Sequence, residues 1–460
     1  MISEAVLISY LALSLAIGFI FKSKADTIKG FLVANREIGE WLLAFTFGAT
    51  YFSSVVIVVG GAWAFLWGST SMLIPLMNVL AGALLTFILI GREINKLSAQ
   101  YDALTVPELF AKVYNNGNLQ KLLGLVTAIG LTLYAATVIS GAAAMVGTVF
   151  GIDLATSAFL IALVMAIYVA LGGMYSVVWT DAIQGIIMAL GVLSLAALAS
   201  LRAGGLGALE ASKPYVPPQK IDVALIVDLA FLTSIAVWGL PQLLNRFYTA
   251  KSPSVVKRST FIATAFAFIV TYGSFISGLA ASHLVQGKVN PLKVIPILAK
   301  EMLGPIGASV FSAAVLAAAM STADSISLTV GSAVAYDILG IRDTKVLRVL
   351  SFLSMVIAAG IAVLTLTLPK ELASAVTSVF KTGWTLTAGA FLVPVLAVVF
   401  KVGRTESVVA SSLVGALVAL LYGFAKALSF KLPFMDMSFC VTILASALAF
   451  VVMEVIRRNG

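Results

Sequence analysis

The sequence predicts an all-α protein that crosses a lipid bilayer many times. Of its 460 residues, 61% are hydrophobic and only 11% are charged, and the mean hydropathy is +1.08. Soluble domains are about half apolar and about a quarter charged. Apolar runs of roughly 20 residues, the length that crosses the hydrocarbon core, recur from end to end. The solvent for most of the chain must therefore be lipid.

We expect about thirteen membrane spans. They cover 4–21, 38–66, 70–91, 120–150, 155–172, 180–201, 222–245, 259–285, 304–337, 346–367, 371–400, 405–427 and 434–456. Several are longer than the bilayer requires, so tilt or extension beyond the membrane is expected. The first span lacks a small-residue cleavage site and is followed by basic residues, so we interpret it as a retained helix. The whole chain is expected to form one transmembrane domain.

The lysines and arginines predict the orientation. With the N-terminus outside, the inner loops carry roughly twice as many of these residues as the outer loops, as the positive-inside rule requires. The rule places the C-terminal Arg457 and Arg458 in the cytoplasm and the protein in the plasma membrane. The net charge of +9 is therefore a topology signal with anionic lipid headgroups as partners, and no nucleic-acid partner is expected.

Cysteine and histidine usage argues against an enzyme. The chain has one cysteine, Cys440, and one histidine, His283. An intramolecular disulfide is therefore impossible, and a thiol metal cluster or a Ser-His-Asp triad is disfavoured.

On the inner side, Thr105-Val-Pro-Glu108 fits a capping box that begins a short amphipathic helix ending near Val113.

Small and hydroxyl residues interrupt the second span, which contains Gly48-Ala-Thr-Tyr-Phe-Ser-Ser54 followed by Gly60 and Gly61. A broken helix at bilayer depth is tolerated only where it lines protein or a water-filled cavity, and its freed carbonyls can hold a cation. The alternative is a small-residue contact between helices.

The ninth span contains Ala317-Ala-Ala-Met-Ser-Thr-Ala-Asp-Ser325. Ala318, Ser321 and Thr322 share one helical face. A carbonyl and two hydroxyls are hard oxygen ligands without net charge, which suits a monovalent cation; calcium normally demands carboxylates. Asp324 lies in the same span, where an ionisable residue is a functional candidate. Alternatively, the hydroxyls bond to carbonyls one turn earlier and only bend the helix.

Two further motifs join or interrupt spans. Gly172-Gly-Met-Tyr-Ser-Val-Val-Trp-Thr-Asp-Ala-Ile-Gln184 is expected to link two spans on the inner face. There Thr180 would cap the next helix and Asp181 would stabilise its N-terminus. Alternatively, Asp181 would place a carboxylate at the cytoplasmic mouth of an ion path. Trp238-Gly-Leu-Pro-Gln-Leu-Leu-Asn-Arg-Phe247 interrupts the seventh span, with Arg246 expected at its inner end. Interrupted spans in both halves indicate a midplane solute site, although an ordinary proline kink is an alternative.

Together these motifs resemble the sodium:solute symporter family over nearly the whole chain. The resemblance implies a leucine-transporter-like core of two inverted five-helix repeats. These would be residues 38–201 and 222–400, preceded by an extra helix and inner loop in 1–37 and followed by two C-terminal helices in 401–460. The resemblance also implies that the protein is not an enzyme and that a monomer would be sufficient for its function.

The resemblance also implies functional residues. Sodium, the coupling ion, would be held by the carbonyls of Ala49 and Phe52, the carbonyl of Ala318 and the hydroxyls of Ser321 and Thr322. Asp181 and Asp324 would lie on the ion path. The side chains expected near the solute are Thr50, Tyr51, Ser53, Trp238, Gln242 and Lys381.

Two positions set this chain apart from the family pattern. Tyr51 stands where the proline symporter has an aspartate, so specificity for proline is doubtful. Lys381 lies about ten residues into the eleventh span, near the middle of the membrane. It either meets an anionic group of the solute or snorkels outward, or it pairs with a protein carboxylate such as Asp228.

The expected function is sodium-coupled symport of a small organic solute into the cell by alternating access, with an amino acid or small carboxylate favoured. A proton-coupled or uncoupled transporter of the same fold is the main alternative; the Ser321–Thr322 pair favours sodium. A channel is less expected, because charged rings or a repeated filter motif are not seen.

Overall fold

The computed structural model of the chain describes residues 2–205, 207, 209, 214–285, 289–367 and 370–459. The elements in these ranges are helical apart from one isolated bridge between Ile38 and Ala250. The prediction of an all-α fold is therefore confirmed.

The helices follow the predicted spans closely. In chain order they are α1 (Ile2–Ile20), α2 (Ile28–Val33), α3 (Glu40–Tyr51), η3 (Val55–Gly60), α4 (Gly61–Trp67), η4 (Gly68–Met72), α5 (Leu73–Met77), η5 (Asn78–Gly91), α6 (Arg92–Gln100), α7 (Val106–Val113), α8 (Gly117–Phe150), α9 (Leu154–Arg202), α11 (Val223–Ser234), η7 (Ile235–Gly239), α12 (Pro241–Thr249), α13 (Pro253–Leu284), α14 (Val294–Ser332), η9 (Ala333–Ile338), α15 (Thr344–Thr367), α16 (Lys370–Phe400), α17 (Thr405–Ala427) and α18 (Ser438–Asn459).

Nine helical stretches of the described residues are long and apolar enough to cross a bilayer, or ten if the bent pair of 223–239 and 241–249 is one span. Three of the nine, 55–100, 154–202 and 291–338, contain 46, 49 and 48 residues. Each of these exceeds twice the roughly 20 residues that one crossing needs. The arrangement is thus roughly consistent with thirteen predicted spans.

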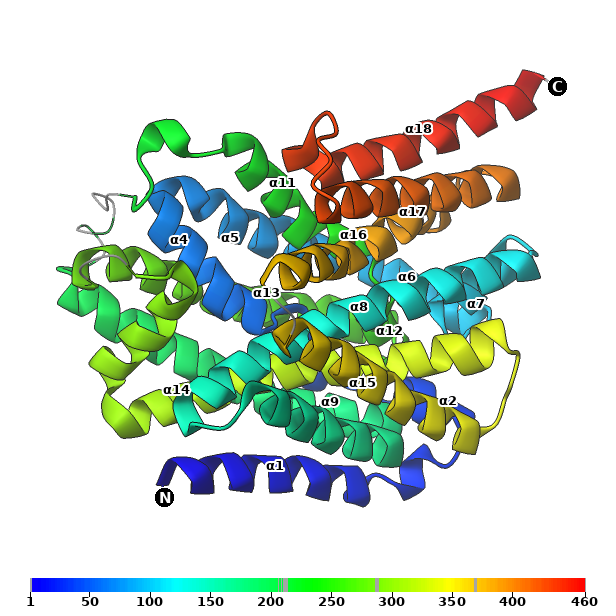
Figure 1. Cartoon of the computed structure of the whole chain (residues 1–460). Coiled ribbons are helices and arrows are strands. Elements are labelled where there is room, and N and C mark those ends of the chain that lie inside the picture. Colours follow the sequence, from blue (N-terminus) through cyan, green and yellow to red (C-terminus); the bar gives the residue numbers. More distant parts are fainter. Residues whose placement is uncertain are drawn as a thin grey trace.

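Figure 1 shows the helices as one bundle, with α1 along one edge and α17 and α18 along the opposite edge. Between these edges α9 packs against α14, α15 and α13, and α16 packs against α8 and α17. The division into two inverted repeats stays a prediction.

Two helices are broken inside the bundle, as the sequence predicts. Helix α3 ends at Tyr51, and the chain is extended at Phe52 (φ −97°, ψ 93°) before η3 begins. The second break is at Leu240 (φ −101°, ψ 109°), between η7 and α12, where Pro241 occupies the first helical position. Proline is tolerated there because that position needs no amide donor.

The link expected between the fifth and sixth spans is shorter than predicted. Element α9 joins two helices across a sharp kink at Gly173 (φ +53°), and Ser176 Oγ donates to the Tyr168 carbonyl at 3.1 Å across that kink. The Cα of Gly173 lies so close to Phe31 that a Cβ would meet the Phe31 ring at 2.6 Å and the Phe31 carbonyl oxygen at 2.8 Å. A glycine at a kink and a glycine in a loop look alike in sequence, because both supply a positive φ.

Two polar contacts bind backbone amides at the start of peripheral helices. The predicted capping box is confirmed in part, since the Glu108 amide donates to Thr105 Oγ1 at 3.1 Å and α7 ends at Val113. At the other edge, the Asp228 carboxylate on α11 accepts hydrogen bonds from the backbone amides of Phe439 (3.3 Å) and Cys440 (2.9 Å) in α18.

Candidate functional site

Oxygen atoms from α3 and α14 meet at the first break. Ser321 Oγ donates to the Ala49 carbonyl at 2.8 Å, and Thr322 Oγ1 donates to the Thr50 carbonyl at 3.0 Å. Both hydroxyls also lie 3.2 Å from the Ala318 carbonyl oxygen. All five residues are buried. The site therefore offers five uncharged oxygen atoms from two helices.

The break explains why these carbonyls are free to bind. Because α3 ends at Tyr51, the carbonyls of its last turn lack amide donors from a following turn. The Phe52 ring stacks on that of Tyr51 at 4.1 Å, and its amide closes the helix by donating to Gly48 at 3.0 Å. The Ser321 and Thr322 hydroxyls of α14 donate to the carbonyls of Ala49 and Thr50. Among the described residues, neither hydroxyl donates to the carbonyl of Phe52. The structure thus brings four of the five predicted ligands together and adds Thr50.

A buried ion pair lies beside this oxygen cluster. Arg246 Nη2 is 3.2 Å from Asp181 Oδ2, and both side chains are at most 1% exposed. The same carboxylate oxygen accepts hydrogen bonds from Thr46 (2.5 Å) and Thr50 (3.3 Å). Asp181 is thus fully buried, in the part of α9 that follows the kink, and it packs against α3; its place on an ion path stays a prediction.

Arg246 is buried, whereas the positive-inside rule counts basic residues that face the lipid headgroups. Its Nε and Nη2 donate to Thr50 Oγ1 at 3.2 and 2.9 Å, and Nη2 also donates to Ser325 Oγ. Its Nη1 contacts the Met174 sulfur at 3.0 Å. Arg246 lies in the last turn of α12, at the end of the bent span as predicted, but its guanidinium is fully buried among α3, α9 and α14.

Asp324 completes the buried cluster from the α14 side. Its Oδ2 accepts a hydrogen bond from the Tyr168 hydroxyl at 2.7 Å, and its Oδ1 accepts one from Ser325 at 3.2 Å. Thr180 is 3.5 Å from the same carboxylate but donates to Ser176 and Val177 one turn earlier at 2.9 and 3.0 Å. The expected N-cap at Thr180 is therefore wrong.

The residues expected near the solute fall into two groups. Tyr51 and Trp238 tie the broken helices together: Tyr51 donates to the Thr233 carbonyl at 2.6 Å, and Trp238 Nε1 donates to the Ala81 carbonyl at 3.0 Å. Gln242, at the start of α12, is buried, and its Oε1 has no hydrogen-bond partner in the described part of the chain. Thr50 belongs instead to the cluster around Arg246 and Asp181.

A second group leads from the α3 break to α16. The Ser53 hydroxyl is hydrogen-bonded to Tyr134, whose ring lies 4.9 Å from that of Trp384. The buried Ser54 Oγ and Trp384 Nε1 have no hydrogen-bond partner among the described residues. Lys381 precedes Trp384 by three residues on α16, but its side chain lies outside the described residues. Its candidate partner Asp228 accepts amide hydrogen bonds from α18, and the pairing of Asp228 with Lys381 stays a prediction.

Sequence reasoning missed the pairing of Arg246 with Asp181 and the parts played by Thr46 and Tyr168. One signal was available: a carboxylate inside a span requires a buried partner, and Arg246 stood beside the second break.

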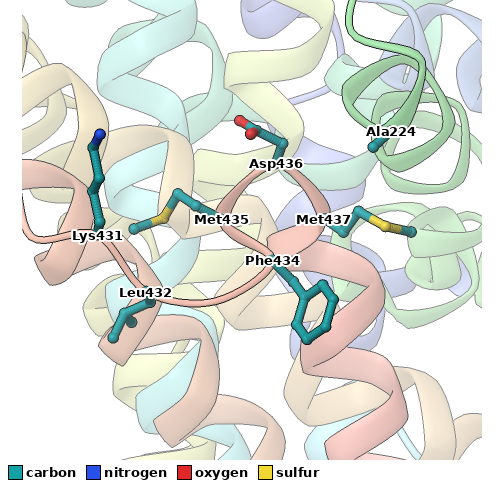
Figure 2. Close-up of a pocket in the computed structure, with 7 residues that line it drawn as sticks. All are labelled: Ala224, Lys431, Leu432, Phe434, Met435, Asp436 and Met437. Atoms are coloured by element: carbon teal, nitrogen blue, oxygen red, sulfur yellow. The ribbon is translucent and has the colours of Figure 1, made fainter.

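The open surface pocket in Figure 2 is a different feature. It is lined by Ala224 and by residues 431, 432 and 434–437 before α18, and no member of the buried cluster lines it.

The broken helix α3 meets the intact helix α14 through neutral oxygens, and the second broken span supplies Arg246 beside them. Within a bundle of membrane-length helices, this arrangement is typical of a cation-coupled secondary transporter. Comparison with known proteins gives the family. The model of the sodium:solute symporter family matches residues 31–423. The chain belongs to this family, so its function class is sodium-coupled solute symport and not an enzymatic reaction.

Curated relatives agree with this assignment, and a solved structure agrees with the fold. The chain is 29% identical to the sodium/pantothenate symporter of Haemophilus influenzae over 322 residues, covering 66% of this chain and 65% of that protein. It is 26% identical to the osmoregulated proline transporter OpuE of Bacillus subtilis, covering 77% of this chain and 75% of that protein. The fold is similar to a Na+-coupled sialic acid symporter in a substrate-bound, outward-open state, with a TM-score of 0.80, 19% identity and coverage of 98% and 97%.

Proposed function

We propose that this chain imports a small organic solute bearing a carboxylate together with sodium, across the plasma membrane, with its N-terminus outside and its C-terminus in the cytoplasm. The sodium ion would bind among the oxygens of Ala49, Thr50, Ala318, Ser321 and Thr322, with Phe52 available if the break rearranges. The observation that carries the proposal is the contact of the Ser321 and Thr322 hydroxyls with carbonyls at the α3 break.

The proposed coupling follows from where these oxygens lie. Each hydroxyl now directs its hydrogen to a carbonyl of α3. A sodium ion would attract the oxygen lone pairs of both groups, so the hydroxyl hydrogens would turn away while the ion bridges α3 and α14. The ion would thereby stabilise the shape of the break that also frames the solute site. Coupling between two sites is reciprocal, so solute would strengthen sodium binding.

The carboxylate preference rests on donors near the break. Ser54 Oγ and Trp384 Nε1 are buried polar groups with no hydrogen-bond partner in the described part of the chain, and buried donors left unpaired are costly. A solute carboxylate could accept from both, and Lys381, three residues before Trp384 in the sequence, would supply a positive charge. Pantothenate, proline and sialic acid, which the relatives are named for, all carry a carboxylate. Gln242, Tyr51, Trp238 and Ser53 would frame the remainder of the solute.

The test is counterflow and uptake in proteoliposomes, with a panel of amino acids and small carboxylates matched to their amides and to uncharged sugars. We expect at least one carboxylate to be taken up only with an inward sodium gradient. Uptake driven equally by a proton gradient without sodium would refute the sodium proposal. Uptake of a sugar but of no carboxylate would refute the solute proposal while leaving the ion site intact.

A further inference from the structure

The buried cluster beside the oxygen site contains three formal charges. Asp181 and Asp324 are acidic and Arg246 is basic, and all three are 0% exposed. The arginine pairs directly with Asp181, and Ser325 connects it to Asp324 by accepting from Arg246 and donating to the carboxylate at 3.2 Å. With both carboxylates ionised, the cluster carries a formal charge of −1.

This charge lies next to an oxygen site that has none of its own. Thr50 joins the two: its carbonyl accepts from Thr322, and its hydroxyl accepts from Arg246 and contacts Asp181. A buried net charge is unfavourable unless a counter-charge lies nearby. A monovalent cation at the oxygen site would bring the sum of the formal charges to zero.

We propose that Arg246 is a positioning residue that sets the charge of the coupling site, so that the site matches one sodium ion. The proposal rests on the sodium site proposed above. It makes a specific claim: sodium affinity follows the summed formal charge of Asp181, Asp324 and Arg246, not the presence of either member of the Asp181–Arg246 pair. Neutral oxygens alone would select for ion size, whereas the cluster supplies the attraction.

The experiment compares purified variants by the sodium concentration that gives half of the maximal thermal shift. Asp181→Asn brings the cluster to zero, and the double variant Asp181→Asn/Arg246→Gln returns it to −1. Arg246→Lys keeps the original charge with a different shape. Each variant is first checked by size-exclusion chromatography and by its melting temperature without sodium, because both single changes remove buried hydrogen bonds.

We expect Asp181→Asn to raise the half-maximal sodium concentration by about tenfold or more, since a unit charge is lost in a medium of low dielectric constant. The double variant should return to within about threefold of the original protein, although its melting temperature stays low, because its charge is restored. Arg246→Lys should also stay within about threefold, because its ammonium retains the charge. A merely structural role would make sodium affinity fall with melting temperature.

A folded double variant that binds sodium as weakly as Asp181→Asn would overturn the proposal. An Asp181→Asn variant with unchanged affinity would overturn it as well, since the carboxylate would then carry no charge. Ser321→Ala separates the two levels of inference. If the original protein shows no sodium response, or Ser321→Ala leaves that response unchanged, the ion site itself is wrong. If Ser321→Ala loses the response but affinity ignores charge, only the role of Arg246 fails.

Discussion

The hydroxyl oxygen of Ser321 lies 2.8 Å from the carbonyl oxygen of Ala49, although 272 residues separate them in the chain. This contact joins the last turn of α3 to the intact helix α14. The break leaves the carbonyls of that turn without amide donors from a following turn. Any solute or ion that changes the break therefore also changes the fit between two helices from different halves of the chain.

Replacing either hydroxyl should weaken sodium binding. We expect Ser321→Ala and Thr322→Ala each to cost about 1–3 kcal/mol, as for an unmade buried polar contact. This corresponds to a roughly 5- to 150-fold higher sodium requirement, measured by uptake across a sodium titration. Ser332→Ala is the matched control, because its hydroxyl bonds only to Thr329 one turn earlier in α14. Unchanged sodium dependence in both test variants would show that the ion binds elsewhere.

Lys381 should contribute to solute binding and not to sodium binding. Lys381→Met is expected to raise the solute concentration for half-maximal uptake by about tenfold, because a charge-assisted hydrogen bond contributes about 1.5–3 kcal/mol. Lys381→Arg should rescue only partly, since a guanidinium is larger and planar. The measurement is solute titration at saturating sodium, with the exposed Lys257→Met as control. A fully active Lys381→Met variant would mean that this lysine snorkels to the interface.

Gly173 is predicted to be required for folding. An alanine there must adopt a positive φ, at about 1–2 kcal/mol, and its Cβ would clash with the ring and backbone of Phe31. We expect Gly173→Ala to lower the melting temperature and the yield of monodisperse protein. Gly360→Ala, in the middle of α15 with nothing within 4 Å of the added Cβ, should be neutral or stabilising. Equal stability of the two variants would contradict the tight packing at the kink.

Arg36 should stabilise the packing of its segment against α6 and α12 through its shape as well as its charge. Its guanidinium donates to the carbonyls of Ser98 (2.9 Å), Ala103 (2.7 Å) and Tyr248 (3.1 Å), which belong to three segments. A lysine ammonium cannot reach all three, so Arg36→Lys should reduce stability by about 1–3 kcal/mol. The exposed Arg258, which pairs with Glu40, provides the control: Arg258→Lys should change stability by less than about 1 kcal/mol. Matching melting temperatures would refute this role for Arg36.

Local signals in the sequence predicted the two helix breaks. The buried pairing of residues from distant parts of the chain could not be predicted in this way. Small and hydroxyl residues around Phe52, and Pro241 after Leu240, act on their own backbone, so their effect is visible in a short window. The position of Arg246 depends on Asp181, which comes from a different helix. A rule that counts basic residues at span ends cannot distinguish an arginine facing headgroups from one paired inside the bundle.

The hydrogen bonds from α18 to Asp228 have a mechanical consequence. Asp228 lies on α11, the same segment that leads through η7 to the second break, so the last helix is fastened to one arm of a broken span. If α11 tilts during transport, α18 either swings with it or releases a carboxylate into an apolar surrounding, which is unfavourable. The C-terminal helix thus acts as a restraint on how far that arm travels.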